Sequence, residues 1–408
     1  MPSKFKNRNA FSSSAQRPNK SPWSSNVVLC RKKNNELRMC VDYRQLNHRT
    51  KKDSYALPRV EDILDALSGN KYFTILDMKS GYHQIEVHEA HKERTAFTIG
   101  PLGFYEYTRM PFGLVNAPAT YQRLMEQCFE GLHLDICYIY LDDLIIYAKT
   151  FEEHLERVEK IFQRLREVNL KLSPKKCEFF KDKVKYVGNI VSEKGIEPDP
   201  GKIDKAKNWP TPTNPDEVRK FLGFVGYYRR FIKGFSDIAR PLNDLLPEGK
   251  KKTRKGAKPK PPPANWKWTS EQETAFKTLK EKLTTYPILG YADYNLPFEL
   301  HTDASSSSLG AVLYQTQDNE KRVIAYASRS LSKSEKNYPA HKREFLALKW
   351  AVCEKFQDYL YGNTFTAITD NNPLTYVMTT TKLDATGQRW VAALTNYTFY
   401  IQTWITER

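Results

Sequence analysis

The stretch CYIYLDDLIIYA, residues 137–148, sets two adjacent aspartates in the middle of an apolar, aromatic and β-branched run. The two arms have the composition of strands, and Asp142 and Asp143 occupy the tight turn between them. Burial removes the hydration of a carboxylate, and neighbouring carboxylates suppress each other's ionisation. A hydrated turn is the alternative, because Asp-rich turns are common, but a solvated turn does not need apolar arms. The stretch therefore predicts a strand hairpin whose acids face a cationic partner.

A second strand supplies a third acid. In KYFTILDM, residues 71–78, strand alternation places Phe73, Ile75 and Asp77 on one face, so that Asp77 ends an apolar stripe. If this strand packs beside the hairpin, three carboxylates converge. Oxygen ligands without His or Cys favour Mg²⁺. Two such ions, about 3.5–4 Å apart, support phosphoryl or nucleotidyl transfer.

Composition limits the class of protein and its partners. The chain has 408 residues, enough for two or three domains, and its 64 Lys and Arg against 47 Asp and Glu give a formal charge of +17. This excess favours a polyanion such as nucleic acid, although a soluble basic protein is the alternative. The six cysteines lack zinc-site spacing, which indicates reduced thiols and an intracellular protein. No apolar run has the length of a membrane span, so no membrane partner is expected.

Changes in composition divide the chain into five segments. Residues 1–20 read as a disordered basic leader, and 248–265 as a Lys/Pro-rich linker. Between them, 21–185 mixes strands and helices, whereas 186–247 is largely helical, with Asn214 predicted to cap a helix. Residues 266–408 restart with strands, then a long helix and another strand, which indicates a separate α/β domain.

That last domain carries a second set of acids. Asp303 ends the strand PFELHTD, and Asp370 ends the strand FTAITD. Glu344 lies on the intervening helix, one turn before Leu348 and two turns before Ala351 and Val352, which are on a largely apolar face. Three acids at the edges of buried elements again indicate a metal site.

Several motifs resemble those of one family and occur along the chain in the same order. YLDD, residues 140–143, resembles the YxDD box of reverse transcriptases, and the neighbouring boxes resemble those of Gypsy-type long-terminal-repeat retrotransposons: CVDYRQLN (40–47), FTILDMKSGYHQI (73–85), RTAFTIGPLGFYEYTRMPFGLVNAPATYQRLM (94–125) and YVGNIVSEKGI (186–196). The resemblance implies an α+β multidomain protein: a right-hand polymerase of fingers, ferredoxin-like palm and thumb, followed by a ribonuclease H-like α/β domain. It also implies that Asp77, Asp142 and Asp143 hold two Mg²⁺ ions, with Mn²⁺ as an alternative.

The same resemblance assigns contacts with the incoming nucleotide. Arg31 and Arg38, on the hairpin before residue 41, match residues that hold its triphosphate, and guanidinium groups suit phosphate oxygens. A solvated cationic hairpin is the alternative. Tyr82 matches an aromatic gate that excludes a 2′-hydroxyl, with a core tyrosine as the alternative. Phe112 occupies a position that shapes the nucleotide pocket.

Contacts with nucleic acid are implied further along the chain. Three residues resemble the grip on the primer end: Tyr186, Val187 and Gly188. A basic group in the thumb-like region, residues 186–247, is expected to contact the nucleic-acid backbone: Arg229, Arg230 and Lys233. The apolar residues of that region are expected to pack rather than to stack on bases.

The C-terminal motifs resemble the ribonuclease H domain of this family: HTDASSSSLGAVLYQ (301–315), AHKREFLALKWAV (340–352) and ITDNNPLTYV (368–377). The resemblance implies metal-dependent hydrolysis of RNA in an RNA–DNA hybrid by Asp303, Glu344 and Asp370. Family members carry a fourth acid that has no counterpart here, and residues 1–20 match nothing in the family. The chain is therefore expected to be a truncated part of a larger polyprotein, with an incomplete ribonuclease H domain.

The resemblance implies an RNA-directed DNA polymerase that extends a DNA primer on an RNA template with deoxynucleoside triphosphates. Two other readings stay open: a truncated, non-catalytic remnant that only binds nucleic acid, and a nuclease without polymerase activity. The sequence leaves a homodimer open, and it does not distinguish a cytoplasmic particle from the nucleus.

Overall fold

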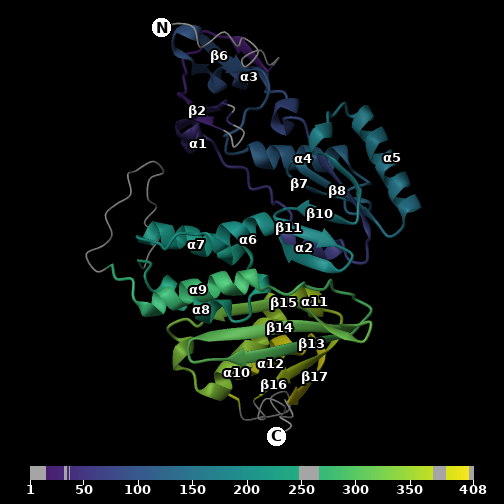
Figure 1. Ribbon diagram of the computed structural model, residues 1–408, viewed down its shortest axis with the longest axis vertical. Helices are drawn as coiled ribbons and strands as arrows, with labels where there is room; N and C mark the ends of the chain where they lie inside the picture. The colour runs from purple at the N-terminus through teal and green to yellow at the C-terminus, as the bar shows by residue number, and fades with distance from the viewer. Residues whose placement is uncertain (1–14, 32–34, 36, 248–265, 371–382, 404–408) are drawn as a thin grey trace. The chain divides into compact units, whose positions relative to one another are not determined.

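The computed structural model describes residues 15–31, 35, 37–247, 266–370 and 383–403 (Figure 1). The predicted linker at 248–265 and most of the predicted leader lie outside these residues. The chain divides into two compact units, Met1–Val187 and Gly188–Arg408. Each unit combines helices with strands, so the predicted α+β architecture is confirmed.

The first unit is built around a four-stranded sheet with the order β7-β8-β4-β9. Its strands are β4 (Tyr72–Asp77), β7 (Cys137–Tyr140), β8 (Asp143–Ala148) and β9 (Glu178–Lys181). All of its pairings are antiparallel. Two helices, α4 (Ala117–Cys128) and α5 (Phe151–Glu167), bury their apolar faces against it. The β-branched and leucine side chains of β8 are fully enclosed, which fixes the strand that begins with Asp143.

The spacing of apolar residues in the sequence of α5 predicts one buried face: Leu155, Val158, Ile161, Phe162 and Leu165. The structure differs from this prediction in one respect. Val158, Ile161 and Leu165 are buried as expected, but Leu155 is 51% exposed and His154 is buried in its place. The His154 Nε2 atom lies 2.8 Å from Thr74 Oγ1 on β4, and burial lowers the pKa of the imidazole to about 4. A neutral histidine with a hydroxyl partner is therefore compatible with this core.

The remaining elements of the first unit are short. A three-stranded sheet joins β1 (Gln16–Pro18), β6 (Phe104–Tyr107) and β5 (Phe97–Thr98), and a separate hairpin joins β2 (Val27–Arg31) and β3 (Leu37–Val41). The other elements are α1 (Arg44–Arg49), α2 (Val60–Ala66), α3 (Glu89–Lys92) and β10 (Lys183–Tyr186).

The predicted leader is wrong at its C-terminal end, because β1 pairs in register with β6. Arg17 lies on this strand, and its Nε donates to Glu106 Oε1 at 2.6 Å. An acidic partner about 90 positions away in sequence therefore orders a segment that has no apolar pattern of its own.

The second unit begins with a hairpin and a group of helices. The hairpin joins β11 (Asn189–Ser192) and β12 (Gly195–Pro198). The helices are α6 (Pro200–Lys207), α7 (Pro215–Tyr227), α8 (Phe235–Asn243) and α9 (Ser270–Thr284). The predicted cap is confirmed, since the Asn214 side chain accepts a hydrogen bond from Glu217 N. The predicted packing role of this region is also confirmed, with Phe221 and Val225 fully buried.

A five-stranded sheet completes the second unit, in the order β15-β14-β13-β16-β17. Its strands are β13 (Phe298–Ala304), β14 (Ser308–Gln317), β15 (Glu320–Ser330), β16 (Thr364–Thr369) and β17 (Thr398–Thr403). The first three strands are antiparallel, and β13, β16 and β17 run parallel.

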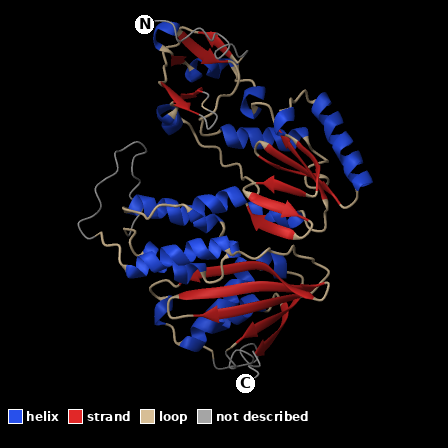
Figure 2. Ribbon diagram, in the orientation of Figure 1, coloured by secondary structure: helices blue, strands red, loops and turns tan. Residues whose placement is uncertain are grey.

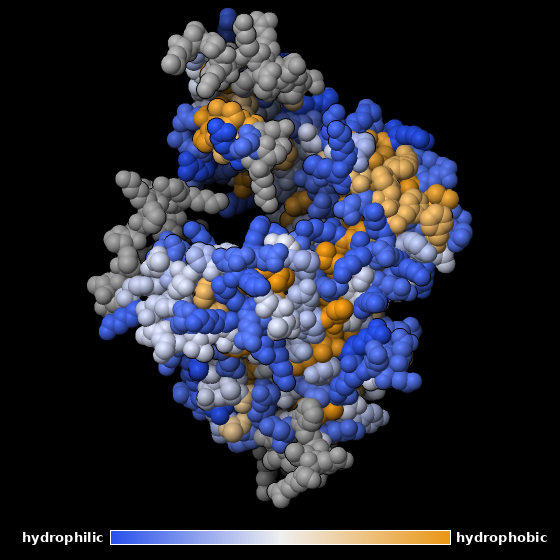
Figure 3. All heavy atoms as spheres, viewed as in Figure 1, coloured by the Kyte–Doolittle hydropathy of each residue, from blue (hydrophilic) through white to orange (hydrophobic). Residues whose placement is uncertain are grey.

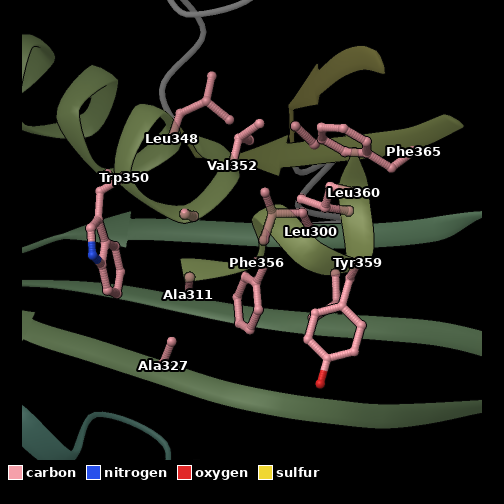
Figure 4. Close-up of a cluster of buried hydrophobic side chains, with 14 of the residues drawn as sticks. Leu300, Ala311, Ala327, Leu348, Trp350, Val352, Phe356, Tyr359, Leu360 and Phe365 are labelled. Atoms are coloured by element: carbon pink, nitrogen blue, oxygen red, sulfur yellow. The ribbon is translucent and has the colours of Figure 1, made fainter. Parts of the chain in front are cut away.

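Helices cover both sides of this sheet (Figure 2). One side packs on α10 (Ala340–Trp350), a π-helical turn (Ala351–Lys355), α11 (Gln357–Leu360) and α12 (Ala385–Leu394). Figure 4 shows the resulting core, in which Leu300 and Phe365 of the sheet meet Val352 and Phe356. The edge strand β15 also packs on α8 and on the short turn Arg229–Phe231.

The viewed face of the molecule is mainly hydrophilic, with apolar side chains in separate patches (Figure 3). Among the helices that the structure describes, none is both long enough and apolar enough to cross a bilayer.

Candidate active sites

The first acid cluster consists of Asp77, Asp142 and Asp143, and backbone pairing brings it together. Asp77 at the end of β4 lies directly opposite Asp143 at the start of β8. Residues opposite each other on antiparallel strands have Cα atoms about 4.5–5.5 Å apart. Asp142 lies in the turn between β7 and β8, where Leu141 has a φ of +53°. Backbone pairing and mutual charge effects place the three acids near one another, and their convergence on a shared metal ion stays a prediction.

A buried glutamine on α4 holds this turn in place. Gln122 Oε1 accepts a hydrogen bond of 2.7 Å from Leu141 N, and its Nε2 donates to Ile139 O at 3.0 Å. The same Nε2 donates to Glu126 Oε1 at 2.8 Å. Sequence reasoning missed Gln122, although an amide on an otherwise apolar helix face was the available signal. The hydrogen bonds of Gln122 compensate for the left-handed backbone conformation of Leu141, which residues other than glycine rarely adopt.

Burial and mutual repulsion raise the pKa of both adjacent acids. For Asp142 the larger cause is burial and the next is the charge of Asp77. For Asp143 burial again comes first, followed by the charges of Asp142 and Asp77. The Asp142 Oδ1 atom is buried without a hydrogen-bond partner among the described residues. An unpaired oxygen among carboxylates that repel one another is suited to bind a cation, because the cation would both pair with the oxygen and offset the repulsion.

Lys176 gives this cluster a partial counter-charge. Its Nζ lies 3.1 Å from Asp77 Oδ1 and 3.2 Å from Oδ2. The ammonium also opposes the rise in the pKa of Asp142 and Asp143. Sequence reasoning missed this residue because it lies 99 positions from Asp77, in a basic segment that looks like solvated surface.

Gly81 lies directly against Asp142 of the first acid cluster. A β-carbon at this position would lie 2.5 Å from Asp142 Oδ1 and 2.7 Å from the hydroxyl oxygen of Tyr121. Real β-carbons do not approach other atoms so closely. Only a residue without a side chain therefore leaves the Asp142 carboxylate in its place.

Two of the residues predicted to bind the nucleotide lie together beside this cluster. The Tyr82 and Phe112 rings have centroids 4.8 Å apart, and Tyr82 also contacts Tyr121 at 5.3 Å. Phe112 is partly exposed, as a pocket residue requires. Arg31 is exposed at the end of β2, whereas the side chain of Arg38 lies outside the described residues. The triphosphate contacts of both arginines stay predictions.

The predicted primer grip lies at the boundary between the two units. Tyr186 is fully buried, and burial followed by the charge of Asp143 raises its pKa. Val187 has a φ of +42° and Gly188 a φ of +78°. A left-handed backbone is unfavourable for a β-branched residue such as valine. The Tyr186 side chain is therefore enclosed within range of the Asp143 charge, and the contact with a primer stays a prediction for Val187 and Gly188.

The basic group of the thumb-like region is only partly exposed. Arg229 donates to the carbonyl oxygen of Ser328 and lies over the Phe235 ring. Arg230 is only 6% exposed, so the prediction that it contacts a nucleic-acid backbone is wrong for this conformation. Its neighbours in the folded unit enclose it, which a local sequence pattern does not reveal. Lys233 is exposed.

The second acid cluster consists of Asp303, Glu344 and Asp370. They come from the end of β13, the first turns of α10 and the residue after β16, and one oxygen of each lies within 4.8 Å of the others. Glu344 Oε1 accepts a hydrogen bond of 3.1 Å from Ala304 N, and Oε2 is buried without a partner among the described residues. Burial, then the charges of Asp370 and Asp303, raises the pKa of Glu344 to about 7. These features fit a divalent cation held by three carboxylates.

Gly81→Ala tests the enclosure of Asp142. We expect at least a ~10-fold loss of Mn²⁺ affinity at the first acid cluster, because the new methyl group displaces a ligand. The measurement is Mn²⁺ titration followed by electron paramagnetic resonance, in an Asp303→Asn/Asp370→Asn background.

Gly223→Ala is the matched control, since a β-carbon there meets no atom within 4 Å. Equal Mn²⁺ affinity in the two variants would contradict the proposed contact.

Glu344→Gln tests the raised pKa. The folded protein binds a proton at Glu344 up to about pH 7, whereas the unfolded chain releases it near pH 4.5. The metal-free wild type therefore loses stability relative to Glu344→Gln as the pH rises from about 4.5 to 7. We expect a difference on the order of 1–3 kcal/mol at pH 8, from urea denaturation without divalent ions.

Glu281→Gln on the exposed side of α9 is the control, and it should follow the wild type at every pH. If the free energy of unfolding of the wild type and of Glu344→Gln changed with pH in parallel, the raised pKa of Glu344 would be refuted.

Comparison with known families matches both halves of the chain. A model described as "Reverse transcriptase (RNA-dependent DNA polymerase)" matches residues 30–191, and one described as "RNase H-like domain found in reverse transcriptase" matches residues 268–367. Two similar curated proteins of Drosophila melanogaster are retrovirus-related Pol polyproteins. That of transposon 412 is 38% identical over 94% of this chain and 30% of its own length. That of transposon gypsy is 38% identical over 92% of this chain and 36% of its own length.

Solved structures show the same fold at lower identity. The foamy viral protease-reverse transcriptase dRH in complex with double-stranded DNA is 23% identical, with a TM-score of 0.81, over 97% of this chain and 68% of that one. The foamy viral protease-reverse transcriptase with double-stranded DNA has a TM-score of 0.79 at 22% identity, over 97% of this chain and 80% of that one. The chain spans about a third of the length of the curated relatives described above. Residues 30–191 therefore belong to the reverse transcriptase family and residues 268–367 to the RNase H-like domain family, and most of the chain is similar to retrovirus-related transposon Pol polyproteins.

Proposed function

We propose that this chain is an RNA-directed DNA polymerase that extends a DNA primer on an RNA template with deoxynucleoside triphosphates. The observation that carries the proposal is the pairing of Asp77 with Asp143, with Asp142 in the adjoining turn. Such a cluster costs free energy unless cations neutralise it, and the family uses divalent metal ions. We assign it two Mg²⁺ ions, with Mn²⁺ as a substitute. When bound, these ions would activate the primer hydroxyl and stabilise the leaving pyrophosphate.

The residues of the chain position the reacting groups. Gln122 holds the Leu141 backbone, and so fixes the direction of the two acids that follow it. The Tyr82 and Phe112 rings border the place beside Asp142 where a nucleotide sugar would lie. A ring there excludes a 2′-hydroxyl and selects deoxynucleotides. Arg31 and Arg38 would hold the triphosphate, and fixed orientation supplies much of the rate enhancement.

The proposed partners are an RNA template, a DNA primer and the RNA–DNA hybrid that they form. A formal charge of +17 favours binding to phosphate backbones, and this attraction weakens as salt rises. Two similar foamy viral proteins were solved with double-stranded DNA and with an RNA/DNA hybrid. In this chain we assign backbone contact to the exposed Lys233 and to the turn at Val187 and Gly188.

The second acid cluster is proposed to hydrolyse the RNA strand of the hybrid. Its three carboxylates would hold a divalent ion. The Glu344 Oε2 atom would be one of the ligand atoms, because it has no hydrogen-bond partner among the described residues. At neutral pH a carboxyl with a pKa of about 7 is only partly ionised, so metal binding at this cluster should release a proton.

Primer extension tests the proposal. We expect extension of a DNA primer on an RNA template with Mg²⁺ and deoxynucleoside triphosphates, and its loss by at least ~1,000-fold in Asp142→Asn/Asp143→Asn, because the ligands for the ions are removed. Asp303→Asn is the control and should retain extension.

Equal signals from wild type and the double variant would overturn the polymerase. Salt-sensitive binding to a primed template without extension would instead support the alternative of a non-catalytic nucleic-acid-binding protein.

A further inference from the structure

A carboxylate of the thumb-like region reaches the turn that follows the strand of Asp303. Asp237 lies in the first turn of α8, about 65 positions before that strand. Its Oδ1 accepts hydrogen bonds from Ser307 Oγ at 3.0 Å and from Ser305 Oγ at 3.5 Å, and its Oδ2 accepts from Ser308 Oγ. Three hydroxyl groups of one turn therefore converge on one carboxylate.

The serine turn, residues 305–308, is ordered from several directions. Ser305 N donates to Ser308 O at 2.9 Å, and Ser308 N donates to Ser305 Oγ at 2.9 Å. Ser307 and Ser308 are buried. These bonds give the turn a defined shape, while Asp237 is the acceptor that connects it with a separate helix. The hydroxyl groups would otherwise lose their solvent partners on burial.

This turn lies directly beside the second acid cluster. Asp303 and Ala304 are the last two residues of β13, and the serine turn begins at the next position. Ala304 N is the donor that holds Glu344 Oε1. A displacement of the turn therefore changes the position of Asp303 and the hydrogen bond of Glu344 together.

The same helical segment also forms a wall of a cavity at this cluster. The cavity has a volume of about 260 Å³, and its lining includes Lys233, Gly234 and Asp237 from the helical segment, with Asp303 and Asp370. Ser236 N donates to Ser328 Oγ of β15 at 2.9 Å, which attaches α8 to the sheet a second time. The acid cluster is therefore bordered by residues from outside the region 268–367 that matches the RNase H-like family.

We propose that Asp237 is a positioning residue for the second acid cluster. By accepting the three serine hydroxyl groups it fixes the turn after Asp303, and so it sets the spacing of Asp303 and Glu344 on which metal binding depends. The inference rests on the proposed metal site, but it concerns the geometry of the turn and can be tested without catalysis.

Hydrogen–deuterium exchange of the full chain tests the first step. In Asp237→Ala we expect the amides of residues 304–308 to exchange about 10-fold faster than in wild type, since the turn loses its external acceptor. Asp237→Asn keeps one acceptor oxygen and the shape of the side chain, so it should restore most of the protection.

Mn²⁺ titration by electron paramagnetic resonance tests the second step, in an Asp142→Asn/Asp143→Asn background that removes the first acid cluster. We expect Asp237→Ala to weaken Mn²⁺ binding by about 10-fold, as residues that support metal ligands commonly do. Asp237→Asn should lie near wild type.

Asp216→Ala is the matched control, because it also removes a first-turn aspartate, from α7, where its partner is Arg219. Unchanged exchange and unchanged Mn²⁺ affinity in Asp237→Ala would overturn the inference, and so would an equal effect of Asp216→Ala. If the wild type binds no Mn²⁺ in this background, the metal site itself fails and the exchange result alone decides the role of Asp237. If the wild type binds Mn²⁺ but does not cleave a hybrid, the proposed nuclease fails while the positioning role stands.

Discussion

The repulsion between carboxylates that the backbone forces together is the constraint on which the rest of the structure depends. Asp77 and Asp143 face each other because β4 and β8 pair in one register, and a shift by one residue would turn each side chain to the opposite face of the sheet. The fully buried residues of β8 fix that register. The apolar core of the first unit thus supplies the free energy that holds the acids close without their cations.

The two acid clusters offset this repulsion differently. In the first, Lys176 approaches Asp77 and supplies part of the missing positive charge. In the second, Glu344 stays buried beside two acids, and its pKa rises to about 7. The first cluster is therefore partly neutralised by the chain itself, while in the second the raised pKa favours the neutral, protonated form of Glu344.

Local pattern predicted the parts of the fold that local chemistry determines. The alternation in β4 identified Asp77, the apolar arms identified the β7–β8 hairpin, and Asn214 marked the start of α7. The residues that were missed act over long distances in sequence: Gln122 clamps a turn about 20 positions away, and Lys176 pairs across 99. A single sequence does not show which polar side chain meets which backbone group.

Some predictions failed because tertiary packing overrode residue type. Arginine is usually found at the protein surface, yet Arg230 is buried within the second unit. Leu155, predicted on the apolar face of α5, is exposed, while His154 is buried with a hydroxyl group of β4 as the partner of its Nε2 atom. For His154 a partner from another element makes burial favourable, and helical periodicity carries no information about that partner.

The absence of a side chain at residue 81 has a consequence for reading related genomes. Transposon copies accumulate mutations, and a frame can stay open long after its product has stopped working. Because a β-carbon at this position would force Asp142 Oδ1 or the Tyr121 hydroxyl to shift, a single codon change there would disturb the first acid cluster while leaving all three aspartate codons unchanged. The codon for this glycine therefore reports on the geometry around Asp142, which an intact YxDD box by itself does not.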